Sequence, residues 1–524
     1  MPLWYEDADL FRHRRAAPVR AWERSVLGVL LFLGVQSVVY FALWWFEAGH
    51  VNNLALFILL SFATWYGVFR IMVGWYNTFH LEQPEPVAPR EGMSVAIFTT
   101  STPGEPYEMF VRTLAALREI RYPHTTYLLD DTRDPRFRAL AEEMGAVHLE
   151  LIGVPGAKAG KINAALARTS EEFIVVLDPD HIPFPGFLDR VLGYFEDEQT
   201  GFVQVAQAYG NARESFVARA AAEQTYAFYG PIMQGMHGTG TAVAIGANCT
   251  FRRKALESIG GHGVGLAEDL VTSIRLHARG WQSVYVPEVL SRGLVPSDLD
   301  SYLKQQLKWS RGVYEVLFRE YPRAFRSLTA YQKISYFMIG SYYLVGVTSL
   351  IFLSVPLIYL LLGKQPAVFL LSEYIAHAAP VGLLGAAIYF FSQRWLADRP
   401  RERGLHWRGT LLKIGSWSVY VKGLALAILG IAVPYIPTAK ERRRARFWVS
   451  ARLPLAVLVI SLLALAWTVY MQLYVLPESE VLITTEVTLG MVTFATMNAL
   501  LMSGRLYAAW LDRDRTDRDR KEDS

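Results

Sequence analysis

The stretch that decides the fold is Phe173-Ile174-Val175-Val176-Leu177-Asp178-Pro179-Asp180-His181. It opens with five apolar residues, three of them β-branched, which is typical of a strand buried on both faces. Pro179 fixes φ and lacks an amide hydrogen, so we expect the chain to turn where the strand ends. Ligands of open α/β sheets bind at that edge, and two carboxylates one residue apart can hold Mg²⁺ or Mn²⁺. Taken alone, such a motif is more often a turn with two solvated aspartates.

Around this stretch, short apolar strands alternate with amphipathic helices from residue 93 to about residue 287. The expected strands cover residues 93–99, 126–130, 147–152, 173–178 and 202–205. Such alternation predicts an α/β fold with a mostly parallel, Rossmann-like sheet and helices on both of its faces.

The composition indicates a membrane protein. The chain has 524 residues, 52% of them apolar, and a mean hydropathy of +0.20, which is high for a soluble protein of this size. The single cysteine, Cys249, excludes an intramolecular disulfide and a cysteine-based zinc site. A formal net charge of +4 is too small to suggest nucleic acid as a partner.

Six apolar runs are long enough for the roughly 20 helical residues that cross a bilayer. They cover residues 26–46, 54–75, 334–362, 368–391, 453–475 and 482–501. Arginines near the N-terminus and between residues 394 and 408 place these segments in the cytoplasm by the positive-inside rule. The further run 410–433 has basic residues on both flanks, which favours an interfacial or re-entrant element, with a seventh span as the alternative.

The predicted organisation follows from these runs. It comprises a cytoplasmic N-terminal segment at 1–25, two transmembrane helices at 26–80, a cytoplasmic α/β domain at 90–320 that ends in interfacial helices, two transmembrane helices at 330–395, an interfacial or re-entrant segment at 396–450, two transmembrane helices at 452–505 and a charged tail at 506–524.

Two further motifs suit an anionic nucleotide. Asp130 and Asp131 end another expected strand, where they can contact a base or ribose or simply cap the next turn. Lys158 and Lys161 lie at the start of a helix, whose amides and positive dipole end also favour an anion. Ordinary helix-start chemistry explains the lysines almost as well.

Two later motifs suit the transfer chemistry itself. Glu268 and Asp269 begin a helix, where the macrodipole favours acids, and a carboxylate there can also act as a general base. Gln305, Lys308 and Trp309 offer an amide, a cation and a flat ring that suit a diphosphate and a sugar. An interfacial helix with a belt tryptophan is the structural alternative.

In order and spacing, these motifs resemble the membrane-integrated processive family 2 glycosyltransferases, and the pattern is most similar to the bacterial cellulose synthase catalytic subunit. That family carries D, D-x-D, (T/x)-E-D and Q-x-x-R-W, and an F-x-V-T-x-K gating loop. The matching stretches are Leu129-Asp130-Asp131, Asp178-Pro179-Asp180, Glu268-Asp269, Gln305-Gln306-Leu307-Lys308-Trp309 and Tyr435-Ile436-Pro437-Thr438-Ala439-Lys440. Lys308 in place of arginine and Ala267 in place of threonine are departures. Too few residues follow the last expected span for a cyclic-dinucleotide-binding domain.

The resemblance implies a GT-A domain that performs an inverting transfer from a UDP-sugar. The implied roles are metal binding for Asp178 and Asp180, donor binding for Asp130, Asp131, Lys158, Lys161, Asp178 and Lys308, catalysis for Asp269 with Glu268, acceptor binding for Gln305, Trp309 and Cys249, and gating for Thr438 and Lys440. The implied cofactor is Mg²⁺ or Mn²⁺.

The implied product is a β-linked polysaccharide, most similar to a β-glucan such as cellulose made from UDP-glucose, which leaves through the enzyme's own transmembrane channel. Curdlan and hyaluronan synthases share the same catalytic parts. The implied location is the inner (plasma) membrane, with the growing polysaccharide, the lipid bilayer and accessory secretion subunits as partners. Transfer of a single sugar to a membrane lipid and a catalytically inactive membrane scaffold are the competing hypotheses.

Overall fold

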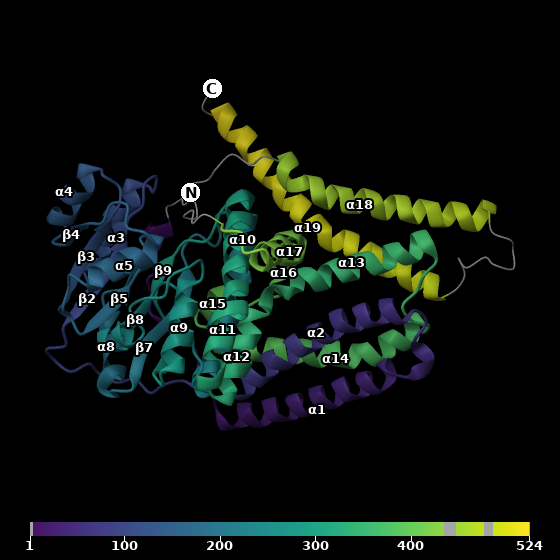
Figure 1. Ribbon diagram of the computed structural model, residues 1–524, viewed down its shortest axis with the longest axis horizontal. Helices are drawn as coiled ribbons and strands as arrows, with labels where there is room; N and C mark the ends of the chain where they lie inside the picture. The colour runs from purple at the N-terminus through teal and green to yellow at the C-terminus, as the bar shows by residue number, and fades with distance from the viewer. Residues whose placement is uncertain (1–3, 434–446, 476–485, 523–524) are drawn as a thin grey trace.

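The structure is a computed structural model that describes residues 4–433, 447–475 and 486–522. Figure 1 shows a sheet flanked by short helices at one end and a group of long helices extending from it at the other. The strands are β1 (Arg14–Arg15), β2 (Val95–Thr100), β3 (Thr125–Asp130), β4 (Val147–Glu150), β5 (Phe173–Val176), β6 (Ile182–Pro183), β7 (Thr200–Tyr209), β8 (Cys249–Arg252) and β9 (Gln282–Gly293).

The sheet order is β1-β9-β7-β8-β5-β2-β3-β4, with β6 paired to β9 outside this path. Parallel pairing joins β4 to β3, β3 to β2, β2 to β5 and β7 to β9. The short strand β8 is antiparallel to both of its neighbours, β5 and β7. The predicted mostly parallel sheet is therefore confirmed, with one reversed strand in its middle.

Strand β5 is buried on both faces, as its sequence predicts. Phe173 and Val175 face the apolar cluster formed by α3 (Tyr107–Arg118) and α4 (Pro135–Glu143). Ile174 and Val176 face the opposite cluster, which includes side chains of α5 (Ala157–Leu166) and α8 (Arg253–Ser258). The alternation of side chains along the strand thus anchors helices on both sides and fixes the position of the turn that follows.

The remaining short helices connect the sheet to the long ones. They are α6 (Phe216–Glu223), α7 (Met233–Gly238), α9 (Glu268–Ala278), α10 (Leu299–Glu315), α11 (Tyr321–Ala324), α12 (Ala330–Gly340) and α15 (Arg399–Glu402). Gly423, on α17 (Trp417–Ile428), lets that helix approach α10, since a Cβ atom there would lie 2.3 Å from Oγ of Ser310.

The N-terminal segment belongs to the sheet. Strand β1 pairs with β9 so that Arg15 lies opposite Glu288, a carboxylate that also binds His13 and Arg190. Residues before α1 (Ala21–Trp45) and the sheet after α2 (Leu54–Phe79) are therefore on the same side of the helices. If α1 crosses a membrane, α2 must cross it back.

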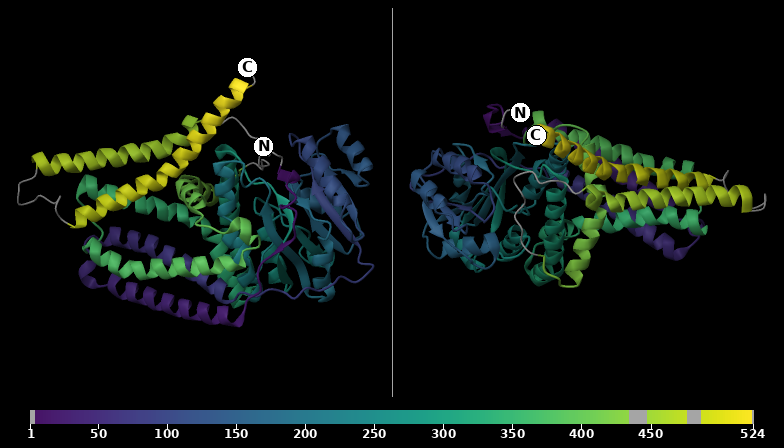
Figure 2. Two further views of the ribbon diagram at one scale, coloured as in Figure 1. Left: turned by 180° about the vertical axis from the view of Figure 1, so that it is seen from behind. Right: turned by 90° about the horizontal axis from the view of Figure 1, so that it is seen from above.

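Within the described residues, five helices are long and apolar enough to cross a membrane: Ala21–Trp45, Leu54–Phe79, Tyr342–Leu362, Leu371–Trp395 and Ser450–Tyr470. The first two are α1 and α2, and the last lies within α18 (Phe447–Tyr470). The third is α13 (Val345–Leu362) together with the short turn before it, and the fourth is α14 (Leu371–Ser392) together with the short turn after it. Figure 2 shows from behind that α1, α2, α13 and α14 extend away from the sheet together.

Three expected helical runs differ in detail. The run 334–362 is divided, because α12 ends at Gly340 and the apolar helix begins at Tyr342. The run 410–433 forms a pair, α16 (Trp407–Gly415) and α17, bent by 49° as in a broken span or a re-entrant loop. The run 482–501 begins outside the described residues, and its remainder lies in α19 (Glu486–Glu522), which is not among the five.

Side chains of α2 form hydrogen bonds at the break between α12 and the apolar helix that follows it. The hydroxyl of Tyr66 donates to the carbonyl oxygens of Ser341 and Tyr342, at 2.7 and 3.1 Å. Arg70, one helical turn further along α2, donates to the carbonyl oxygen of Met338 at 2.5 Å. These bonds satisfy carbonyl groups that lose their helical partners at the break.

Candidate active site

A cavity of about 850 Å³ connects the sheet to the long helices. On the sheet side it is lined by residues that follow the strands, and it continues between α2, α12, α13 and α16. The predicted site residues among its lining are Lys158, Asp178, Asp180, Glu268, Asp269, Gln305, Lys308 and Trp309. Motifs separated by up to 150 positions in the sequence therefore converge on one space.

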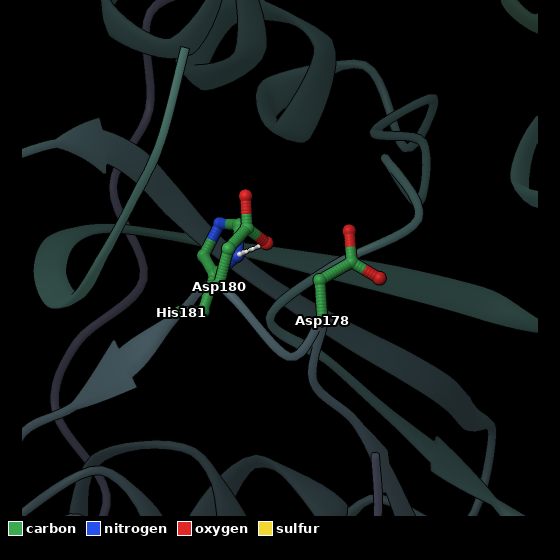
Figure 3. A group of neighbouring side chains, drawn as sticks. All are labelled: Asp178, Asp180 and His181. Carbon is green, nitrogen blue, oxygen red and sulfur yellow. Dashed lines mark hydrogen bonds and ion pairs between the residues drawn. The ribbon is translucent and has the colours of Figure 1, made fainter. Parts of the chain in front are cut away.

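The turn after β5 brings together three side chains of the types that can hold a metal ion. Asp178, Asp180 and His181 each offer a ligand atom, and these atoms all lie within 4.8 Å of one another. Figure 3 shows Asp180 and His181 joined by a hydrogen bond, of 3.0 Å between Oδ1 and Nδ1, with Asp178 opposite them. Two carboxylates and an imidazole form a donor set that fits a divalent cation such as Mn²⁺ or Mg²⁺.

His181 is a site residue that the sequence analysis missed. Its ring also lies 3.2 Å, Nε2 to Nε2, from the amide of Gln207 on β7. Gly293, the last residue of β9, leaves room for the ring, because a Cβ atom there would lie 2.3 Å from it. The only sequence signal is its position directly after the second aspartate.

The predicted turn at Pro179 is confirmed by its hydrogen bonds. The amide of His181 donates to the carbonyl oxygen of Asp178 at 3.0 Å, which closes the turn. The hydroxyl of Thr113 on α3 donates to the carbonyl oxygen of Pro179 at 2.6 Å. The two carboxylates are therefore presented by a fixed backbone at the carboxyl end of β5.

Asp130 and Asp131 lie beside the cavity rather than in its lining. Asp130 accepts hydrogen bonds from Ser101 at 2.5 Å and from the amide of Thr132 at 2.9 Å, and its other oxygen lies 2.9 Å from Nε2 of His148. Burial acts to raise the pKa of Asp130, but these hydrogen bonds outweigh it and lower that pKa. The carboxylate thus shapes the loop after β3, while Asp131 accepts from the amide of Gly153 at 2.9 Å.

The two lysines of α5 have different surroundings. Lys158 forms an ion pair with Asp178 and donates to the carbonyl oxygen of Gly246. Burial opposes its charge, yet the carboxylate of Asp178 raises the pKa of Lys158 overall. Lys161 donates to the carbonyl oxygen of Ser101 at 2.6 Å, and its burial lowers its pKa. Lys158 therefore belongs to the cavity and Lys161 to its supporting loop.

Glu268 and Asp269 begin α9 and face the cavity together. Burial, followed by the charge of the adjacent Glu268, raises the pKa of Asp269 to about 7. Burial likewise raises the pKa of Glu268. Gly246 adopts a positive φ of 81°, and a Cβ atom there would lie 3.3 Å from Oδ2 of Asp269. A carboxylate with a pKa near neutrality is suited to accept a proton from a sugar hydroxyl.

Helix α10 presents the last motif. Gln305, Lys308 and Trp309 share one face of the helix, because residues three and four apart lie above one another. Gly312 lets α10 contact the start of α9, since a Cβ atom there would lie 2.9 Å from the amide nitrogen of Ala267. The proposed acceptor motif and the proposed base are thus packed against each other.

Cys249 does not line the cavity, although its predicted role in acceptor binding requires it to do so. It is part of β8, 1% exposed, and packs in the apolar core beside Phe251 rather than lining the cavity. Burial raises the pKa of its thiol well above the usual value, which keeps it neutral. The alternation of β8 points its side chain inward. The predicted gating residues Thr438 and Lys440 lie outside the described residues.

Comparisons with known proteins point to the glycosyltransferases. Residues 105–312 match the family described as glycosyltransferase-like family 2, and residues 257–384 match the cellulose synthase family. Residues 105–312 are therefore similar to the family 2 glycosyltransferases, and the predicted GT-A fold is confirmed.

Among curated proteins, the chain is similar to UDP-forming cellulose synthase catalytic subunits. It is 30% identical over 270 residues to that of Komagataeibacter sucrofermentans, covering 50% of this chain and 34% of the relative. It is 27% identical over 342 residues to that of Xanthomonas axonopodis pv. citri, covering 62% of this chain and 47% of the relative. The chain thus spans less than half the length of these relatives, and the predicted resemblance to them is confirmed.

Among solved structures, the chain is similar to a mannosyltransferase, PcManGT from Pyrobaculum calidifontis, in complex with GDP-Man and Mn²⁺. The two are 17% identical with a TM-score of 0.47, over 72% of this chain and 100% of the other.

Proposed function

We propose that this protein is a processive inverting glycosyltransferase that builds a β-linked polysaccharide from a UDP-sugar, with UDP-glucose as the favoured donor. The observation that carries the proposal is the convergence of Asp178 and Asp180, Glu268 and Asp269, and the Gln305–Trp309 motif on one cavity. The cavity then continues between apolar helices, which is the arrangement that chain extrusion needs.

The donor side of the cavity would be built on β5. Asp178, Asp180 and His181 would hold Mg²⁺ or Mn²⁺, which when bound supplies positive charge to a diphosphate. Lys158 adds a cation beside the same carboxylates, and Lys308 adds another from α10. Asp130 and Asp131 at the end of β3, with Lys161 of α5, support the uridine side.

The acceptor side would be built on α9 and α10. Asp269 accepts the proton of the acceptor hydroxyl as that oxygen attacks the anomeric carbon, and UDP leaves in the same displacement. Glu268 orients Asp269 and raises its proton affinity. The ring of Trp309 lines the cavity, where its flat face suits the C–H face of the terminal sugar.

The membrane arrangement is part of the proposal. The sheet domain lies in the cytoplasm, the apolar helices cross the inner membrane, and 410–433 enters the membrane from the cytoplasmic side and returns. Tags at Arg403 and at Arg444 should both be protected in spheroplasts and labelled only after lysis. Labelling of either tag from outside would show that the segment crosses. The lipid bilayer and accessory secretion subunits are the further partners that this arrangement implies.

The decisive experiment uses purified protein and labelled UDP-sugars, supplied singly and in pairs. We expect a long product from UDP-glucose that linkage-specific β-glucanases digest. A single-sugar glycolipid would favour the lipid-acceptor alternative, and absence of any product with every donor would favour an inactive scaffold. Curdlan-type or hyaluronan-type products would be identified by the enzyme that digests them.

A further inference from the structure

Two cations line the part of the cavity that lies between the long helices. They are Arg70 on α2 and Lys413 on α16. Both lie over the ring of Tyr342, with Cζ of Arg70 at 5.1 Å and Nζ of Lys413 at 5.8 Å from its centroid. Helices far apart in the sequence therefore bring two positive charges to one place on the cavity wall.

No carboxylate within the described ranges forms an ion pair with either cation. Arg70 donates to the carbonyl oxygen of Met338, and the ring of Tyr342 is the recorded partner of Lys413. Among the residues that the structure describes, the acids that line the cavity all come from the sheet domain: Glu105, Asp178, Asp180, Glu268 and Asp269. The helical part of the lining thus carries positive charge that its own described residues do not neutralise.

Such charge is unfavourable among apolar helices unless an anion or water compensates it. A ring face offers some compensation to a cation, but one tyrosine shared by two cations cannot neutralise both. Sugar hydroxyls can accept hydrogen bonds from such cations but do not neutralise their charge. An anionic ligand would gain from both.

The position of the cations shows which part of a ligand they would meet. Asn77, at the end of α2 next to the sheet domain, has its carbonyl oxygen packed against Gly235 of α7. Arg70 lies seven residues before it, which corresponds to about 10 Å along the helix. The cations therefore meet the acceptor behind its reactive end, in the portion that has already passed the transfer site.

We infer that the acceptor carries an oxyanion, a carboxylate or a phosphate, and that Arg70 and Lys413 bind it behind the transfer site. The inference rests on the proposed function and deepens it, because it adds an acidic group to the acceptor while the donor and the β-linkage remain as proposed. The catalytic carboxylates and the family 2 chemistry are unchanged by it.

The test measures acceptor binding without any UDP-sugar. The probes are three oligosaccharides of equal length and linkage: a neutral β-glucan, the same glucan oxidised to carboxylates at C6, and the same glucan with a phosphate at its reducing end. Binding to purified wild-type protein in detergent is followed by calorimetry at low and high salt. The variants are Lys413→Gln, Arg70→Gln and the double substitution, with Arg326→Gln, an exposed cation outside the cavity, as the matched control.

We expect at least one acidic probe to bind about tenfold or more tightly than the neutral one, equivalent to about 1.4 kcal/mol. The double variant and high salt should remove that preference, and Arg326→Gln should retain it. The acidic probe that gains affinity distinguishes carboxylates along the chain from a terminal phosphate. Lys413→Gln leaves the bond from Arg70 to Met338 intact, so it tests the charge even if Arg70→Gln disturbs the fold.

Equal binding of all three probes, or an acidic preference that survives the double substitution, would overturn the inference. UDP-sugar turnover on the same preparations separates this failure from failure of the proposed function. Elongation of the neutral probe at full rate without acidic preference would leave the transferase standing and remove the anion site. Absence of turnover with every probe and every UDP-sugar would remove both.

Discussion

Lys158 forms an ion pair with Asp178, and the same ammonium group donates to the carbonyl oxygen of Gly246. Asp180, two residues further on, is instead hydrogen-bonded to the ring of His181. The two aspartates of the motif therefore have unequal surroundings. Asp178 is partly neutralised by a lysine, while Asp180 and His181 form the pair best placed to bind a metal ion directly.

The first prediction concerns this pair. Asp180→Asn should lower metal-dependent turnover by about 100-fold or more, because a neutral amide is a poor ligand for a hard cation. Asp178→Asn should lower turnover by less than Asp180→Asn does. EDTA should abolish the wild-type activity, and Mg²⁺ or Mn²⁺ should restore it. Asp189→Asn, a half-buried acid outside the cavity that pairs with Arg121, is the control and should be active. Full activity of wild type in excess chelator would contradict the metal assignment.

A second prediction tests the packing of His181. Gly293→Ala should weaken Mn²⁺ binding and lower thermal stability, because the added Cβ atom would lie 2.3 Å from the imidazole ring. The strain of such overpacking is typically about 1–3 kcal/mol. The control is Gly74→Ala, because a Cβ atom at Gly74 would have no heavy atom within 4 Å. Gly280→Ala is unsuitable, since the positive φ of 86° at Gly280 would itself cause strain. Unchanged Mn²⁺ affinity in Gly293→Ala would argue against His181 as a ligand.

A third prediction separates chemistry from donor binding. Asp269→Asn should reduce the rate by about 10²–10⁴, the usual contribution of a general base, while UDP affinity hardly changes. Asp300→Asn is the matched control, since Asp300 also lies in the first turn of a helix but pairs with Lys304 at the surface. Near-normal synthesis by Asp269→Asn would show that Asp269 acts only as a helix-terminal acid.

The pH dependence of turnover follows from the same residue. Because the pKa of Asp269 is about 7, this carboxyl is protonated below neutral pH and cannot accept the acceptor proton. We expect kcat/KM to fall about tenfold for each pH unit below 7 and to reach a plateau above it. The residual activity of Asp269→Asn should lack this acid limb. If kcat/KM of Asp269→Asn still falls below pH 7 as in the wild type, a group other than Asp269 causes the fall.

A fifth prediction concerns Glu288, which joins the N-terminal strand to the sheet. Burial acts to raise its pKa, but hydrogen bonds from His13 and Arg190 lower that pKa to about 2. The ionised carboxylate therefore stabilises the fold above pH 4.5, and this stabilisation is lost as the pH falls from 4.5 towards 2. Glu288→Gln should reduce stability on the order of 3 kcal/mol at pH 7 and flatten the acid dependence. The exposed Glu257→Gln should do neither, in thermal melts at pH 7 and pH 4.

The sequence predicted the mostly apolar strands β2, β3, β4, β5 and β7, but not the two-residue strands β1 and β6 or the strands β8 and β9. Strand β8 has only four residues and includes Thr250 and Arg252, whose burial depends on neighbouring strands. Strand β9 contains Glu288 and Arg292, whose charges are satisfied by residues from the N-terminal segment and from Asp398. Polar residues that become buried through such distant partners give no local periodicity.

The site was predictable to the extent that its motifs are contiguous. The D-x-D, E-D and Q-x-x-K-W motifs meet in the cavity as expected. Cys249 was placed in the acceptor site by resemblance, whereas strand alternation turns it into the core. Arg70 and Lys413 could not be found from the sequence, because only the packing of α2 against the helices around Tyr342 brings them together.

The pairing of β1 with β9 also determines when the N-terminal segment can fold during protein synthesis. His13 and Glu288 are 275 positions apart, so the N-terminal segment leaves the ribosome long before its partner strand exists. At about 5–20 residues per second, the delay is roughly a quarter of a minute to one minute. During that interval α1 and α2 can already enter the membrane, while the N-terminal segment and its five arginines have no β9 strand to pair with. The N-terminal strand β1 can therefore join the sheet only after β9, the last strand of the sheet, has been synthesised.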